Sequence, residues 1–309
     1  MSKRILVLAC SYPSSLDPLA GIFVQAQAGV LAAEYSVAVL NPMIYGIGGF
    51  IRRIQQTAES DTGLERVPVV RPRAFLSQTS PRSIRKGLLK SARAGLNELC
   101  DSWGKPDLVA AHFAVYSGWL GLQIAKDLNI PYVLHEHASP FAMYLRDSES
   151  RELARLAIAG ASSVIAVSPH LEREILDFDP AARTVAIGNF VDTDHFTLAT
   201  QPRAPQPFTF LSVGKASSQK GFSYLLEAAA ILARREEKKF RIVLGGDGPE
   251  LSALRRLAVQ LQISHVVDFL GSIPPSLVLE NMRACDCVVM PSLHESFCIV
   301  LAEAMACGK

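Results

Sequence analysis

Phe208-Thr-Phe-Leu-Ser-Val-Gly-Lys215 is an apolar run of strand length that ends in a glycine and a lysine. A helical pattern over Phe222–Arg235 follows it, and the apolar run Ile242–Leu244 then begins the same order again. Short apolar runs that alternate with amphipathic helices are typical of a parallel sheet covered by helices on both faces. This stretch therefore predicts an α/β domain with a doubly wound parallel sheet.

The alternation continues on both sides of this stretch. Toward the end of the chain, the expected strands are Val266–Leu270 and Cys287–Met290, and the expected helices are Pro249–Leu261, Ser276–Ala284 and Phe297–Cys307. Toward the start, the expected strands are Ile5–Cys10, Val37–Leu40, Leu108–Ala111, Tyr132–Leu134, Val164–Val167 and Thr184–Ile187. The helices expected between them are Phe23–Tyr35, Ile84–Cys100, Trp119–Asn129, Glu152–Ala159 and Leu171–Leu176.

A polar stretch without periodicity separates the two alternations. It lies between Val191 and Pro207 and is crowded with prolines, a composition typical of domain linkers. A chain of 309 residues is also long enough for about two domains. We therefore expect a first domain over residues 1–190, a linker over 191–207 and a second domain over 208–309.

The composition excludes several classes of protein. Hydrophobic residues make up 49% of the chain and charged residues 19%, which is too little charge for a disordered chain. A net charge of +2 is too small to hold nucleic acid without a local site. No run approaches 18 apolar residues, so any membrane contact is expected to be peripheral. The six cysteines fit the free thiols of a reducing compartment, which predicts a cytoplasmic location.

One segment is strongly basic. From Arg66 to Arg93 there are eight basic residues and no acidic one. If Ile84–Cys100 is helical, five of these residues fall along one face, away from the apolar side chains. They are Arg82, Arg85, Lys86, Lys90 and Arg93. Two interpretations stay open: a solvated helix face, or a surface that meets anionic lipid or a phosphorylated acceptor.

Polar residues follow several of the expected strands. In doubly wound sheets, ligands bind beyond the carboxyl ends of the strands, so these residues mark the expected site. They are Gly21 in the loop after the first strand, His112, His135-Glu136-His137, Gly214-Lys215 and Gly245-Gly-Asp-Gly-Pro249.

These residues belong to a longer, ordered set of motifs. In the second half the motifs are Phe210-Leu-Ser-Val-Gly-Lys215 with Lys220-Gly221, Val243-Leu-Gly-Gly-Asp-Gly-Pro249, Phe269-Leu-Gly271, Met290-Pro-Ser292, Glu295-Ser-Phe297 and Glu303-Ala-Met-Ala-Cys-Gly308. In the first half they are Pro106-Asp-Leu-Val-Ala-Ala-His112, Ile130-Pro-Tyr-Val-Leu-His-Glu-His137, Val164-Ile-Ala-Val-Ser168 and Asn189-Phe-Val-Asp192 with Phe196. In this order the set closely resembles the retaining glycosyltransferases of family 4, also described as glycosyl transferases group 1.

The resemblance implies the GT-B architecture, in which two Rossmann-like doubly wound domains face a cleft. It also implies transfer of a sugar from a UDP-, GDP- or ADP-sugar to a hydroxyl of a glycan or lipid-linked acceptor. The setting would be cell-surface polysaccharide or glycolipid synthesis, in the cytoplasm or peripherally on the inner face of the cell membrane. Neither a cofactor nor a metal is expected. Family chains continue beyond the motif at Glu303, so the second domain is expected to be incomplete at Lys309.

The resemblance also implies which residues bind the donor. Lys215 and Lys220 would meet the diphosphate, since fixed cations and helix N-terminal amides can stabilise the negative charge that develops there in place of a metal. Glu295 would accept from hydroxyls of the donor sugar, and Glu303 from the ribose. The full donor-binding set is Gly21, Gly214, Lys215, Lys220, Gly246, Ser296, Phe297, Cys298 and Glu303. The family usually has arginine at the Lys215 position and more often has glycines around Ser296 and Cys298.

His137 and Glu295 are the expected catalytic residues. His137 matches the family histidine that reaches the donor sugar from the first domain, where a neutral imidazole suits a hydrogen bond to a hydroxyl. The family lacks an obvious protein nucleophile, and same-face attack with the leaving phosphate as base is the usual proposal.

Three further patterns in the sequence could hold a metal ion, but each is weaker than the glycosyltransferase motifs. His135 and His137 can share one face of a strand, but no third ligand is identified by spacing. Asp192-Thr-Asp194 spells the Asp-x-Asp of metal-dependent glycosyltransferases, although it falls at the expected linker. A zinc set from Cys285, Cys287, His294 and Cys298 would need two cysteines two residues apart on a strand, which is too spread for tetrahedral closure.

Two other functions stay open: a nucleotide-sugar-binding protein without turnover, and a nucleotide-sugar epimerase with the GT-B fold.

Overall fold

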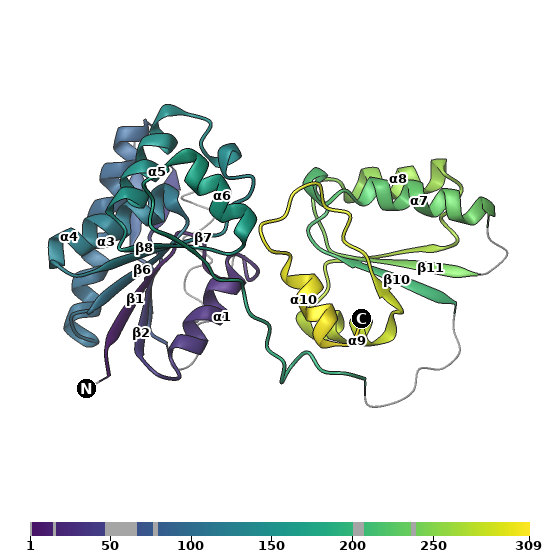
Figure 1. Cartoon of the computed structure of the whole chain (residues 1–309), viewed down its shortest axis with the longest axis horizontal. Coiled ribbons are helices and arrows are strands. Elements are labelled where there is room, and N and C mark those ends of the chain that lie inside the picture. Colours follow the sequence, from purple (N-terminus) through teal and green to yellow (C-terminus); the bar gives the residue numbers. More distant parts are fainter. Residues whose placement is uncertain (1, 15–16, 47–66, 77–79, 200–206, 236–238) are drawn as a thin grey trace. The chain divides into compact units, whose positions relative to one another are not determined.

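The computed structural model describes residues 2–14, 17–46, 67–76, 80–199, 207–235 and 239–309. The chain folds as two compact units, Met1–Gly188 (unit 1) and Asn189–Lys309 (unit 2), shown in Figure 1. The expected linker begins inside unit 2, and its residues 200–206 lie outside the described part.

Unit 1 contains a sheet of seven parallel strands. In spatial order the strands are β4 (Val69–Val70), β2 (Ser36–Leu40), β1 (Arg4–Leu8), β6 (Leu108–His112), β7 (Tyr132–Glu136), β8 (Ser163–Ala166) and β9 (Thr184–Ala186). The strand order reverses between β1 and β6, so the sheet has a topological switch point there. The strands β3 (Met43–Gly46) and β5 (Arg73–Leu76) form a separate parallel pair.

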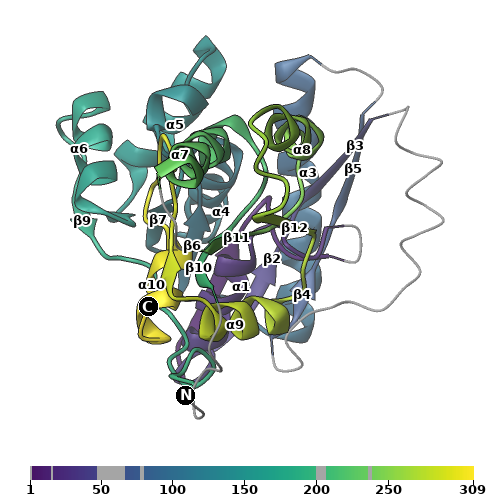
Figure 2. The ribbon, with the colours of Figure 1, turned by 90° about the vertical axis from the view of Figure 1, so that its right-hand side faces the viewer.

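Five helices are described in unit 1: α1 (Ile22–Leu31), α3 (Pro81–Ser102), α4 (Trp119–Leu128), α5 (Ser148–Gly160) and α6 (Pro169–Phe178). The short turns η2 (Ala114–Gly118) and η3 (Phe141–Tyr144) join strands to helices. Figure 2 shows α3 running beside the pair β3–β5. Helix α6 begins two residues before the expected start because Ser168 caps it, accepting from the Leu171 amide at 3.2 Å, and Pro169 fits its first turn.

Unit 2 has the parallel strand order β12 (Val267–Gly271), β11 (Phe240–Gly245), β10 (Phe208–Val213) and β13 (Cys287–Val288). Its helices are α7 (Phe222–Arg235), α8 (Leu251–Gln260), α9 (Pro275–Ala284) and α10 (Ile299–Ala306). Helices α7 and α8 cover one face of the sheet, and α9 and α10 cover the other (Figure 1). The order reverses between β10 and β13, which places a second switch point there.

The α/β fold with parallel sheets is confirmed, but several helix starts were wrong. Helices α3, α5 and α6 begin two to four residues before their expected starts, and α8 and α10 begin two residues after theirs. Helix α8 begins at Leu251, not Pro249, because the preceding residues pair with the loop after β10: Ala216 donates to Asp247 and Glu250 donates to Ala216, both at 3.0 Å. Helix α10 begins at Ile299, not Phe297, because Cys298 has a left-handed backbone (φ 64°) that a helix does not adopt. The strands β3, β4 and β5 were also missed.

Candidate active site

The loops after β10 and β13 meet at the switch point of unit 2 and bring together two expected site residues. Lys220 closes the short turn η4 (Ser218–Lys220) after β10, and its Nζ lies 2.6 Å from Oε1 of Glu295. The Ser292 hydroxyl donates to the same oxygen at 2.7 Å. Because both side chains are only partly exposed, a cation and a carboxylate are held side by side where a doubly wound sheet binds its ligand.

The two loops are also joined by their backbones. The Leu293 amide donates to the Gln219 carbonyl at 2.8 Å, and the Gln219 side chain donates to the His294 carbonyl at 3.1 Å. Gly221 has φ 63°, and a Cβ there would lie 2.2 Å from the Pro291 carbonyl oxygen. The glycine after Lys220 is therefore required for the close approach that positions the ion pair.

A second close approach lies at the ends of β10 and β11. Gly246 has φ 131°, its amide donates to the Gly271 carbonyl at 2.7 Å, and a Cβ would lie 1.9 Å from the Gly214 carbonyl oxygen. The Lys220 side chain passes Gly214, since a Cβ on Gly214 would lie 3.7 Å from Lys220 Cε. Lys215, by contrast, is exposed.

The start of α10 carries the remaining residues expected to bind the donor. Ser296, Phe297 and Cys298 are half-buried and lead into the helix, with Cys298 in the left-handed conformation noted above. A side chain in this conformation costs about 1 kcal/mol or more, whereas glycine adopts it without that cost. Glu303 follows on α10, and burial raises the pKa of its carboxyl to about 6. Above that pH the group is an acceptor-only carboxylate.

In unit 1, His137 lies just beyond β7 beside two further histidines. His112 Nδ1 lies 3.0 Å from His137 Nε2, and the His135 ring packs tilted against both rings at centroid distances of 5.3 and 4.7 Å. Burial lowers the pKa of His112 to about 3 and of His135 to about 4, and holds the pKa of His137 well below its ordinary value. All three imidazoles are therefore neutral at pH 7. His137 is 7% exposed, and the Phe23 ring packs 4.6 Å away.

Glu136, one of the polar residues expected at the strand ends but given no role of its own there, organises this turn. Its buried carboxylate accepts from the amides of Ala114, His137 and Ala138 at 2.7–2.8 Å. Burial raises the pKa of this carboxyl, and the three hydrogen bonds oppose that rise. The signal in the sequence was an acidic residue between two histidines, just after the expected strand Tyr132–Leu134.

Gly21 precedes α1, in the loop after β1. Its φ is 61°, and a Cβ there would lie 2.3 Å from the Ser11 carbonyl oxygen. The same loop is tied to η2, because the Ser117 hydroxyl accepts from the Cys10 amide at 2.9 Å. Gly21 thus allows the backbone to fold closely at the switch point of unit 1.

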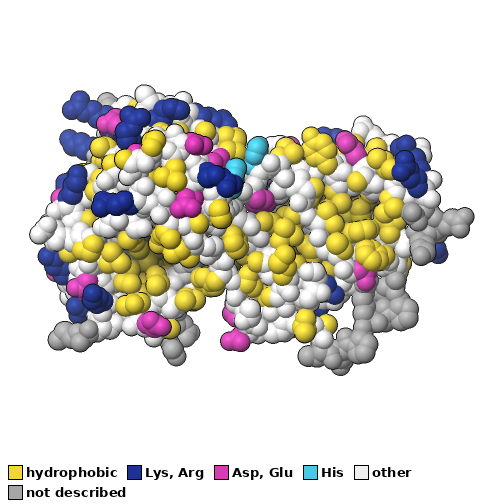
Figure 3. Space-filling model, in the orientation of Figure 1, with side chains coloured by type: hydrophobic (Ala, Val, Ile, Leu, Met, Phe, Trp, Pro, Cys, Tyr) yellow, Lys and Arg dark blue, Asp and Glu magenta, His cyan; other side chains and the backbone are white. Residues whose placement is uncertain are grey.

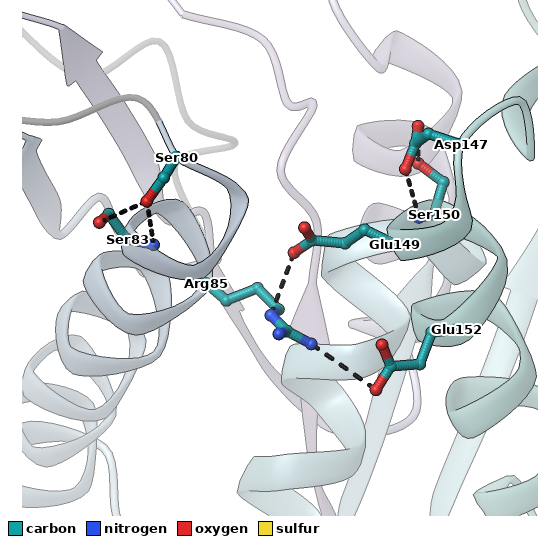
Figure 4. A network of polar contacts seen from close by, with 7 residues as sticks. All are labelled: Ser80, Ser83, Arg85, Asp147, Glu149, Ser150 and Glu152. Carbon is teal, nitrogen blue, oxygen red and sulfur yellow. Dashed lines mark hydrogen bonds and ion pairs between the residues drawn. The ribbon is translucent and has the colours of Figure 1, made fainter.

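The basic helix α3 has four of its five expected cations exposed and Arg85 half-buried. Arg85 points toward α5 and pairs with Glu149 at 3.0 Å and Glu152 at 3.8 Å, in the network of Figure 4. Arg93 forms a two-bond contact with Asp127 at 2.7 and 2.9 Å. Within the described part of the chain, Arg82, Lys86 and Lys90 make no such pair, and we call these three residues the α3 patch. Basic and acidic side chains are interspersed over unit 1 in Figure 3.

The expected site residues thus form two groups, each inside one unit. Lys220 and Glu295 are in contact, Gly214 and Gly246 adjoin them through the sheet ends, and Glu303 lies on the helix that follows. His137 and Gly21 lie at strand ends of unit 1. Ser292 was missed as a partner of Glu295, although it belongs to the motif Met290-Pro-Ser292.

Two family models match this chain in succession. "Glycosyltransferase Family 4" matches residues 48–195, and "Glycosyl transferases group 1" matches residues 197–309. Among curated proteins, the chain is 29% identical to the "Putative teichuronic acid biosynthesis glycosyltransferase TuaC" of Bacillus subtilis, over 98% of this chain and 78% of that protein. It is 32% identical to a "D-inositol 3-phosphate glycosyltransferase" of Corynebacterium urealyticum, over 65% of this chain and 54% of that one. For six further curated relatives, the match spans about half of their length.

Solved structures resemble the whole chain. Sucrose-phosphate synthase from Thermosynechococcus elongatus has a TM-score of 0.76 at 20% identity, covering all of this chain and 80% of that one. HepE of Anabaena, solved with UDP and glucose, has a TM-score of 0.69 at 20% identity, with coverage of 100% and 79%. This likeness confirms the expected GT-B fold. In the part of the chain that the structure describes, no helix has both the length and the apolar character to span a membrane.

Proposed function

This chain belongs with the family-4 type of glycosyltransferases, and from that premise we propose that it moves a sugar from a nucleoside diphosphate sugar to a hydroxyl of a glycan or lipid-linked acceptor. The observation that carries the proposal is the contact of Lys220 with Glu295 at the unit 2 switch point. A diphosphate needs a cation and a sugar hydroxyl needs an acceptor, and this pair supplies both within one hydrogen-bond length.

Each site residue then has a separate task. Lys220 and Lys215 balance the charge that grows on the leaving diphosphate, so turnover needs no metal for this step. Glu295 accepts from hydroxyls of the transferred sugar, and ionised Glu303 accepts from the ribose. His137, neutral at pH 7, hydrogen-bonds the sugar near the reacting carbon. The acceptor hydroxyl attacks the anomeric carbon on the face from which the diphosphate leaves, and the leaving phosphate takes its proton. The configuration at the anomeric carbon is therefore retained.

Two of the similar proteins support a nucleotide-sugar donor and a role in cell-surface polysaccharide synthesis. HepE was solved with UDP and with UDP-glucose, and TuaC is described for teichuronic acid biosynthesis. We therefore rank UDP-sugars first among the possible donors. For the acceptor, we propose a cell-surface polysaccharide or glycolipid. GDP-sugars and ADP-sugars are the other donors to be tested.

The test begins with a thermal-shift panel of UDP-, GDP- and ADP-sugars. For the nucleotide that binds, Lys220→Ala is expected to weaken the affinity about 10- to 100-fold, because a hydrogen bond to a charged group contributes roughly 1.5–3 kcal/mol. Calorimetric titration measures this change. The control Lys239→Ala removes an exposed lysine just before β11, at the other end of the sheet, and should leave the affinity unchanged.

Equal affinity of the Lys220→Ala variant and the wild type would remove Lys220 from the donor site. Loss of turnover after chelation would contradict the metal-free reaction. Product analysis by NMR tests retention at the anomeric carbon and also detects an epimerised nucleotide sugar.

A binding protein without turnover is the second candidate. Two observations favour it: the strained Cys298 at the start of α10 and the exposed Lys215, which offers a single point charge where the family usually has arginine. Donor binding without any transferred or hydrolysed sugar would identify this case.

We also propose that the α3 patch docks the enzyme on anionic membrane, where a lipid-linked acceptor would lie. Each cation near such a surface contributes about 1 kcal/mol, so the patch should raise binding to anionic over neutral vesicles roughly 100-fold. Co-sedimentation of the wild type and of the variant with Arg82, Lys86 and Lys90 changed to Gln measures this difference. A control variant changes three other exposed lysines of unit 1, Lys3, Lys105 and Lys126. Equal, negligible binding of the wild type to both kinds of vesicle would leave a solvated helix face.

A further inference from the structure

The histidines around the end of β7 come from two strands. His135 lies on β7, and His137 follows it two residues later, just beyond the last residue of the strand, Glu136. The parallel pairing of β6 with β7 places His112 directly opposite His135. The register of the sheet therefore supplies the third imidazole that the spacing of the sequence does not reveal.

The three rings are close enough to share one ion. One ring nitrogen from each histidine lies within 4.8 Å of the other two. His112 Nδ1 and His137 Nε2 are already 3.0 Å apart, which is near the separation of about 3.3 Å that two nitrogens have on a tetrahedral zinc with bonds of about 2.0–2.1 Å.

Two ring nitrogens of this histidine cluster have no hydrogen-bond partner among the residues that the structure describes. Within the described part of the chain, His135 Nε2 and His137 Nδ1 are buried without a hydrogen bond. A buried polar atom without a partner is unfavourable, and an ion bound through His135 Nε2 would satisfy that atom. Neutral imidazoles are the form that binds metals, and the buried carboxylate of Glu136 in the same turn would offset part of the added charge.

We propose that His112, His135 and His137 bind one zinc-type transition-metal ion through one nitrogen each, with the fourth position open to water or an oxygen ligand. Imidazole sets of this kind bind zinc, copper and nickel, and not magnesium or calcium. One consequence rests on the proposed function: because His137 is assigned to the donor sugar, the bound ion would inhibit transfer instead of assisting it.

The test titrates the full chain, freed of metal with a chelator, with zinc chloride in a calorimeter near neutral pH and without any nucleotide. We expect one ion per chain, and His135→Gln should raise the dissociation constant at least about tenfold. His135 is chosen because it is the least buried of the three. The control His170→Gln changes an exposed histidine on α6 and should bind zinc as the wild type does.

A second measurement uses Co²⁺ on the wild type, so that the result does not depend on the folding of a variant. An absorption spectrum with the visible bands of bound Co²⁺ but without a near-ultraviolet sulfur-to-metal charge-transfer band supports the histidine site. Such a band would assign the ion to cysteines and overturn the proposal, as would absence of binding or unchanged affinity in a folded His135→Gln variant. Since no nucleotide is present, failure of the proposed function would leave these results unaffected.

Discussion

Gly246→Ala is expected to destabilise unit 2 by at least about 3 kcal/mol. A Cβ at this position would overlap the Gly214 carbonyl oxygen at 1.9 Å, and the backbone has φ 131°, a region that residues other than glycine rarely occupy. The clash is between backbone groups of adjacent strand ends, so no side-chain rotation relieves it. Circular dichroism during urea unfolding measures the loss.

The chain offers an internal reference and a matched control for this experiment. Its two tryptophans, Trp103 and Trp119, both lie in unit 1, so their emission follows unit 1 alone. That signal should be unchanged in the Gly246→Ala variant. Gly271→Ala shares a positive φ of 68° but meets no atom within 4 Å, so it should cost only about 1 kcal/mol. If both variants lose the same stability, the close approach at Gly246 does not have the assigned importance.

Lowering the pH from 7 to 5 is expected to destabilise unit 1 by about 2 kcal/mol for each buried histidine. Burial lowers the pKa of His112 to about 3 and of His135 to about 4, and that of His137 also falls well below its ordinary value. In the unfolded chain these groups take up protons below about pH 6.5, whereas the native state does not. Their stabilising contribution is thus complete above pH 6.5 and is lost as the pH falls toward 4. Glu136, with its raised pKa, offsets part of this loss.

Urea unfolding followed by tryptophan emission, at pH 7 and pH 5 with a chelator present, measures this dependence. The variant His112→Gln should reduce the difference between the two pH values by about 2 kcal/mol. His170→Gln, which changes a histidine with a 61% exposed side chain, should leave the difference as it is in the wild type. A free energy of unfolding for unit 1 that is equal at both pH values would contradict the burial of neutral imidazoles.

The local patterns predicted the main strands and helices well, because buried parallel strands and amphipathic helices show in short windows of sequence. Helix starts were less predictable where distant backbone decides them. The residues before α8 pair with Ala216, and Cys298 takes a conformation that no propensity favours. The missed strands β3, β4 and β5 are two to four residues long, too short for periodicity to appear.

In the candidate site, too, local features could be predicted from the sequence and long-range contacts could not. The residue types at strand ends were predictable from the motifs, but their contacts were not. Lys220 and Glu295 meet across 75 residues of chain, and His112 reaches His137 across 25. Both contacts depend on strand order and register, which are properties of the assembled sheet.

The strand order of unit 1 also governs how the sheet can assemble during synthesis. β1 pairs on one side with β2, which follows soon after it, and on the other with β6, where Ile5 meets Leu108. The chain is made at about 5–20 residues per second, so the β6 side of β1 stays unpaired in the nascent protein for on the order of several seconds. Closing such a long loop also costs entropy before any contact repays it. Until β6 is made, that open edge of β1 is exposed to wrong pairing with a neighbouring chain on the same polysome.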